Sequence, residues 1–115
     1  MPLQRAKLAN IQFISTTASV VYTNPSNTKT YIRGLIVFNS GGSAETVKLY
    51  IVPDSGTNVG IASTGNQFMN VSVNASQTLF VEMPYVITLT GTNETLQAST
   101  TTQSRVTIQI LGDKE

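Results

Sequence analysis

Few residues in this sequence have side chains suited to catalysis, and they are scattered. There are six carboxylates and no His, Cys or Trp. The lack of His removes the usual general base near neutral pH and the commonest metal ligand, and the lack of Cys excludes disulfides and thiolates. A two-carboxylate glycosidase using Glu82 and Glu94 would rest on residue type alone, because we expect Glu82 on an outer strand face and Glu94 in a turn. We therefore expect no enzyme, no catalytic residues, no metal site and no cofactor.

Two short stretches invite a ligand-binding interpretation. "YIVPDSG" offers Ser55 as a nucleophile and Asp54 as an oxygen ligand, but Pro-Asp-Ser-Gly is typical of a β-turn after a strand. "SGGSA" at 40–44 could hold a phosphate only at the start of a helix, and the residues on both sides of it read as strands. We predict a hairpin loop there, with Gly41 and Gly42 in backbone conformations that other residues resist, and its tip as a candidate subunit contact.

Period-two alternation predicts that the elements positioning these residues are strands throughout. Thr, Ser and Asn fill 37 of the 115 positions, which suits strands and turns better than helices. About nine strands are expected, at 10–15, 19–23, 31–39, 45–53, 67–74, 77–83, 85–89, 94–99 and 104–110. The strand at 31–39 is apolar on both faces, so we expect it to be covered on both. Residues 1–10 lack strict alternation and are predicted as an N-terminal arm, leaving 11–115 as one sandwich or barrel domain.

Charge is distributed unevenly along the chain. Residues 1–44 carry Arg5, Lys7, Lys29 and Arg33 and no acid, whereas residues 45–115 carry three cations and six acids. Either the four cations are ordinary solvated surface, or they form a basic arm that docks on an acidic neighbour. They do not cluster as phosphate binding requires, so no nucleic-acid partner is expected. No apolar run approaches a membrane span and the first ten residues lack a secretion signal, so we expect no membrane association and an intracellular origin.

Aromatic side chains predicted to be exposed give a further set of candidate contacts. They are scattered over different strands, which favours packing or subunit contact over stacking on a sugar or a base. By strand phase they are Tyr22, Tyr31, Tyr50, Phe80 and Tyr85.

Three stretches resemble the small all-β virion proteins of tailed bacteriophages. They are "TKTYIRGLIVFNSGGSAETVKLYIVPDSG", "QTLFVEMPYVI" and "GTNETLQASTTTQSRVTIQILG", which together span about residues 28–112. In such proteins a strand of the "iRgivvfN" kind precedes a short Gly/Ser/Ala loop and a "tvtLyivp" strand. A "G-t-L-qa" turn and strand and a closing "vtvqilG" follow. The resemblance implies one compact β-sandwich of about eight or nine strands, jelly-roll or immunoglobulin-like.

The resemblance also implies a function and partners. We expect a non-enzymatic virion protein, assembled in the bacterial cytoplasm, that binds copies of itself as a homotrimer and binds the major capsid protein as a head decoration or cement protein. The alternative is a tail or tail-fibre module that binds a receptor or glycan on the host surface. The candidate partner-contact residues are Arg5, Lys7, Lys29, Tyr31, Arg33, Gly41 and Gly42.

Overall fold

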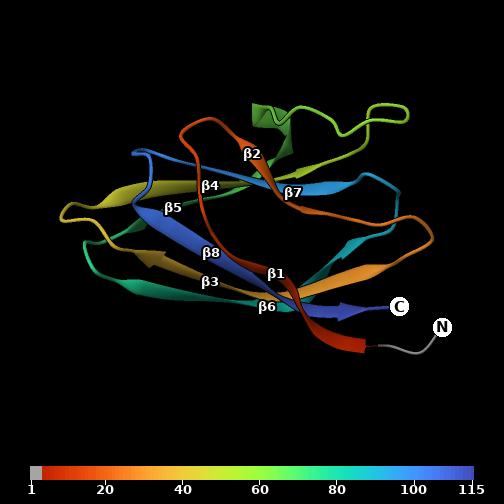
Figure 1. Ribbon diagram of the computed structural model, residues 1–115, viewed down its shortest axis with the longest axis horizontal. Coiled ribbons are helices and arrows are strands. Elements are labelled where there is room, and N and C mark those ends of the chain that lie inside the picture. Colours follow the sequence, from red (N-terminus) through yellow and green to blue (C-terminus); the bar gives the residue numbers. More distant parts are fainter. Residues whose placement is uncertain (1–3) are drawn as a thin grey trace.

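The chain forms two four-stranded antiparallel sheets that pack face to face (Figure 1). This structure is a computed structural model, which describes the backbone of residues 4–115 and the side chains of residues 8–115. The strands are β1 (Gln4–Phe13), β2 (Ser19–Thr23), β3 (Thr30–Asn39), β4 (Glu45–Val52), β5 (Gln67–Val73), β6 (Thr78–Leu89), β7 (Thr95–Thr100) and β8 (Val106–Lys114). A short 3-10 helix, η1 (Thr64–Asn66), precedes β5. The predicted all-β sandwich is confirmed.

The strand order identifies the sandwich as a jelly roll. One sheet has the order β1-β8-β3-β6 and the other β2-β7-β4-β5, so each connection except β4–β5 passes from one sheet to the other. Eight strands in two sheets that exchange the chain in this way are the jelly-roll arrangement, whereas an immunoglobulin sandwich keeps consecutive strands paired within a sheet. The loops at 40–44 and 90–94 therefore join the two sheets, and predicting the 40–44 loop as a hairpin was wrong. A local pattern shows two strands and a short loop, but not which strands pair.

The core lies between the two sheets and is built from alternate residues of each strand. Val106, Ile108 and Ile110 of β8 are fully buried, and Val47 and Leu49 of β4 face them from the other sheet. These inward positions agree with the predicted alternation.

The N-terminal segment differs from its prediction as an arm. Residues 4–10 belong to β1, which pairs with β8 from Gln4 opposite Lys114 to Phe13 opposite Thr107. Register shifts between Lys7 and Ala9, and between Ala9 and Gln12, break the alternation that would have identified a strand in the sequence. Residues 1–3 lie outside the described part of the chain.

Irregular pairing between Ile32 and Gly34 of β3, which is a bulge against β8 and a longer excursion of β6, explains two further differences from the predicted strands. The pairing of β3 with β6 jumps from Ile32–Ile87 to Gly34–Glu82, which leaves the residues around Pro84 out of the ladder. Pro84 is tolerated there because β6 is an edge strand. The strands predicted at 77–83 and 85–89 are therefore a single strand, β6. The bulge also changes the phase of β3, so that Ile32, Leu35 and Val37 all face the core.

Close contact between β3 and β8 depends on Gly112. A Cβ atom at this position would lie 2.0 Å from the backbone oxygen of Tyr31. Only glycine permits the two strands to approach so closely beside the bulge.

Among residues 4–115, no helix has the length and apolar character needed to cross a membrane.

Candidate interaction surface

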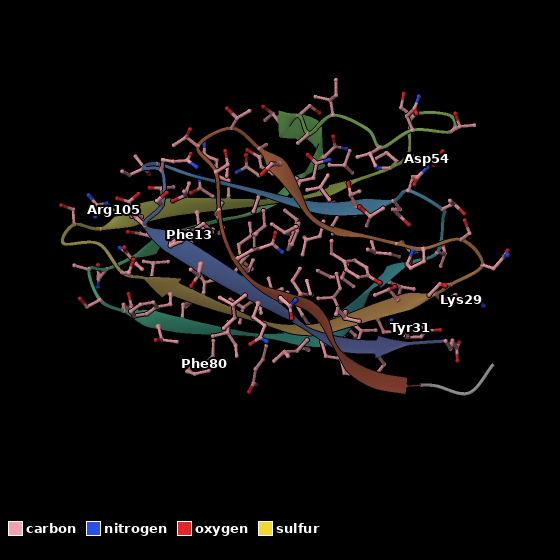
Figure 2. All side chains as sticks on the ribbon, viewed as in Figure 1. Phe13, Lys29, Tyr31, Asp54, Phe80 and Arg105 are labelled. Carbon is pink, nitrogen blue, oxygen red and sulfur yellow. The ribbon has the colours of Figure 1, made fainter. Side chains whose placement is uncertain are left out.

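The structure divides the predicted contact residues between the two ends of β3. Lys29, Tyr31 and Arg33 lie where β3 begins, and Gly41 and Gly42 lie just beyond its other end, roughly 30 Å away at about 3.3 Å per residue. Figure 2 shows Lys29 and Tyr31 at one end of the sandwich and Arg105, which packs on Gly41, at the opposite end. These residues therefore cannot form one contact patch on a single subunit.

The first end gathers five of the seven predicted residues. In the backbone register Arg5 lies opposite Asp113, which lies opposite Tyr31 of β3. Lys7 is likewise on β1, opposite Leu111. The side chains of residues 4–7 lie outside the described part, so only their strand positions are established.

Charged side chains at this end are engaged with one another. The Tyr31 hydroxyl donates a 2.7 Å hydrogen bond to Oε1 of Glu115, and the Arg33 guanidinium forms an ion pair with the buried Asp113 carboxylate. The hydrogen bond to Glu115 raises the pKa of Tyr31 above its ordinary value of 10.0, and desolvation and the negative charge of Glu115 act in the same direction. Beside them an open hollow of 620 Å³ is lined by Asn27, Thr28, Lys29, Thr90 and Glu115.

The second end is organised by a buried asparagine that sequence reasoning did not single out. The Asn39 amide donates hydrogen bonds to the backbone oxygens of Ser43 and Val73, at 2.8 and 3.0 Å. Its Oδ1 accepts a 2.9 Å bond from the Gly41 amide. Asn39 is fully buried, so this side chain fixes the 40–44 loop.

Neither glycine of that loop has a positive φ; the positive-φ glycine among the described residues is Gly56. The prediction of unusual backbone conformations at Gly41 and Gly42 was therefore wrong. At Gly41 the requirement is space, because a Cβ would lie 3.1 Å from Cδ of Arg105 and 3.2 Å from Oδ1 of Asn39. At Gly42 nothing lies within 4 Å. In the turn at 90–94 the residue with a positive φ is Asn93, at 66°.

The outer face of the β1-β8-β3-β6 sheet carries apolar side chains that nothing in the described chain covers. Phe80 is 70% exposed, Phe13 55% and Phe38 37%. Strand pairing places them in two adjacent rows, with Phe13 and Phe38 on either side of Thr107 and Phe80 beside Ile36. In Figure 2 Phe80 points away from the opposite sheet. We call Phe13, Ile36, Phe38, Phe80 and Leu111 the apolar outer face.

This face corrects the prediction that the strand at 31–39 is covered on both sides. The inner side of β3 is buried, whereas Phe38 on the outer side is partly open to solvent. The apolar residues on both faces of the strand at 31–39 therefore indicate two surfaces, one in the core and one available for contact with another molecule. Exposed apolar groups gathered on one sheet are typical of interaction sites.

The predicted exposed aromatics fall into two groups. Phe80 and Tyr85 are exposed at 70% and 90%, as their phase indicated. Tyr22 and Tyr50 are 91% buried, and their hydroxyls lie 2.8 Å from Oγ1 of Thr30 and 3.4 Å from Oγ of Ser99. The expected exposure of these two was wrong: Tyr22 belongs to the hydrophobic core, and each hydroxyl lies beside another buried hydroxyl.

The carboxylates considered for catalysis lie in structural positions. Glu94 accepts hydrogen bonds from the amides of Thr90 and Gly91 at 2.9 and 3.2 Å, which closes the 90–94 turn. Glu82 is exposed on an outer strand face. Within residues 4–115 no three acidic side chains come together as a metal site would need.

The structure establishes the fold class, a jelly-roll β-sandwich. No protein-family model matches the sequence, and no curated protein matches it.

Proposed function

We propose that this chain is a non-enzymatic structural protein of a bacteriophage virion, and specifically a head decoration or cement protein that binds the major capsid protein. The apolar outer face is the observation that carries the proposal, because it is a ready surface for another protein. The resemblance of residues 28–112 to virion proteins points the same way. Jelly rolls are common in viral capsids, which is support by analogy only.

In this role the protein would act as an adhesive. The three phenylalanines would be buried against a partner, and the interleaved Thr and Gln side chains of β8 and β6 would form the polar part of the contact. Burying a phenylalanine fully contributes about 1.5–3 kcal/mol, so Phe80 would be a main contributor to affinity. Copies bound all over a shell would together resist expansion and rupture through avidity.

Binding to heads assembled without the protein tests the proposal. Wild-type protein should co-sediment with such heads and raise the temperature at which they release DNA. Phe80→Ser should bind at least tenfold more weakly while keeping its far-UV circular dichroism. Phe68→Ser is the matched control, because Phe68 is 39% exposed but lies on β5 of the other sheet. If wild-type protein does not bind, or if both variants bind as well as wild type, the proposed role is wrong.

Assembly as a homotrimer is part of this proposal. It follows from the resemblance, and three copies around a symmetry axis of the shell would each present the same outer face to the capsid. Sedimentation equilibrium of the purified 12.3 kDa chain should give three times that mass. A monomer at micromolar concentration would remove this part of the proposal.

A tail or tail-fibre module that binds a host glycan is the second candidate function. It is favoured by Tyr85, which is 90% exposed on β6 next to Pro84 and is free to stack on a sugar ring. Binding on a glycan array that is lost in Tyr85→Ala, together with labelling at the tail tip of intact particles, would select this function over decoration. Labelling over the head would exclude it.

A further inference from the structure

A second candidate site lies at the end of the sandwich opposite to the pair formed by Gln4 of β1 and Lys114 of β8. It is a hollow of 380 Å³ lined by Gly41, Gly42, Ser43, Glu45, Thr102 and Arg105. The loop between β3 and β4 forms one wall, and the loop between β7 and β8 forms the other. Arg105 marks this end in Figure 2.

Glu45 brings a carboxylate into the wall of this hollow. It alternates along β4 with Val47 and Leu49, which are fully buried in the core, so its side chain points between the sheets. Glu45 is only 5% exposed, and its Oε1 is buried without a hydrogen-bond partner among the described residues. On the paired strand β7, Oγ1 of Thr100, opposite Val47, is also buried without a partner among the described residues.

A buried carboxylate without a partner is unfavourable, and proteins normally place a cation beside it. Arg105 is the cation in the hollow, but no ion pair joins it to a carboxylate among the described residues. Its stem packs over Gly41, and its backbone oxygen accepts 2.8 Å bonds from both the amide and the hydroxyl of Ser40. No salt bridge therefore joins Glu45 to a cation among the described residues.

We propose that this hollow binds a primary ammonium group, with Glu45 as its counter-ion. A divalent metal would need more carboxylates than the single one present. A guanidinium would pair best with both carboxylate oxygens, and Oε1 of Glu45 is shut off from solvent. An ammonium has three donors, which the carboxylate, the hydroxyls of Ser43 and Thr102 and loop carbonyls can satisfy.

The site is formed before a ligand arrives. Asn39 fixes the 40–44 loop through three hydrogen bonds, so the wall that leads into Glu45 needs no reordering on binding. A preformed site loses less entropy when it binds. This ammonium site does not depend on the virion role, since the ammonium could belong to a free amine or to a lysine side chain.

Thermal unfolding with butylammonium chloride tests the site directly. Against equal concentrations of tetramethylammonium chloride, which has no N–H donor, butylammonium should raise the Tm of wild-type protein by several degrees at saturation. Glu45→Gln should weaken this response at least tenfold. Glu82→Gln is the matched control, because it removes an exposed carboxylate from the outer face and should respond as wild type does.

A second ligand identifies the source of the amine, and a second variant tests the site if Glu45→Gln fails to fold. Nα-acetyl-lysine methylamide should also bind if the site takes a lysine side chain; binding of butylammonium alone assigns a free amine. Thr102→Val, in an exposed loop, should weaken binding without affecting the core, in case Glu45→Gln fails to fold. No response to either amine, or an equal response in Glu45→Gln, overturns the proposal. So does a double-mutant cycle in which Arg105→Gln and Glu45→Gln destabilise the protein equally and non-additively, because Arg105 would then be the counter-ion.

Discussion

Asn39→Ala should destabilise the protein strongly although it removes only one small polar side chain. The side chain makes three hydrogen bonds, to the backbone of Ser43, Val73 and Gly41. Each contributes about 1 kcal/mol net, and a buried partner left unsatisfied adds to the cost. The carbonyl of Val73 has no access to solvent in a fully buried residue, so we expect a loss of about 3 kcal/mol in the free energy of unfolding.

The loss translates into a measurable change in melting temperature. At about 2.1 cal/mol/K per residue, the unfolding entropy of 115 residues is about 0.24 kcal/mol/K, so 3 kcal/mol lowers the Tm by about 12 °C. Urea unfolding followed by circular dichroism gives the free energy independently. Amide hydrogen exchange should become faster at Gly41, which loses its acceptor, before it changes in the core strands.

Asn70→Ala is the control for this prediction. Asn70 is exposed on β5 and has no side-chain hydrogen bond within the described part of the chain, so its replacement should change stability by less than about 0.5 kcal/mol. The reasoning is refuted if Asn39→Ala loses less than about 1 kcal/mol. It is also refuted if both variants lose the same amount, because burial and bonding of Asn39 would then have no special weight.

Of three further predictions, two concern the contacts of glycine residues and one concerns the titration of Tyr31. Gly112→Ala should lower the free energy of unfolding by about 3 kcal/mol or more, since its Cβ would lie 2.0 Å from the Tyr31 backbone oxygen; soluble, cooperatively folding protein of unchanged Tm would contradict this. Gly41→Ala should destabilise by about 1 kcal/mol and Gly42→Ala should be neutral or slightly stabilising, which paired urea curves will separate. Because the folded-state pKa of Tyr31 is raised, its bond to Glu115 contributes stability that is complete below pH 10.0 and is lost above it. In ultraviolet titration Glu115→Gln should lower the Tyr31 pKa, and an unchanged curve would show that the bond is not formed.

The strands could be predicted from the sequence wherever alternation is regular. Val106, Ile108 and Ile110 face the core as their spacing indicated, because a strand must present every second side chain to the same side. Only the end of β1, at residues 10–13, was recognised, since two register shifts between Lys7 and Gln12 interrupt that period. Sheet membership could not be read either, because pairing depends on residues far apart in the chain.

The candidate surfaces were only partly visible in the sequence. Phe80 was predicted to be exposed from its position in the strand alternation. Phe13 and Phe38 could not be assigned to the same surface, because they come together only when β1 and β3 flank β8 in one sheet. Glu45 reads as an ordinary acid at the start of a strand, although it lies in phase with Val47 and Leu49 and is buried with them. The small-residue loop was correctly placed between strands, but the role of Asn39 depends on contacts that no spacing indicates.

The position of β8 has a consequence for how the chain folds during synthesis. β8 lies between β1 and β3 in its sheet and is the last of the eight strands to be translated. Both neighbours therefore lack a pairing partner until β8 has been synthesised. The nascent protein can close the β4–β5 hairpin early, but β1 must remain unpaired with β8 until residues 106–114 leave the ribosome. Pairing of the first strand with the last closes a loop of nearly the whole chain, which makes folding slow, on the order of milliseconds to seconds. Throughout that interval Leu35 and Val37 of β3, which are buried in the folded protein, lack their β8 neighbours, so the demand for chaperones should be greatest just before β8 emerges.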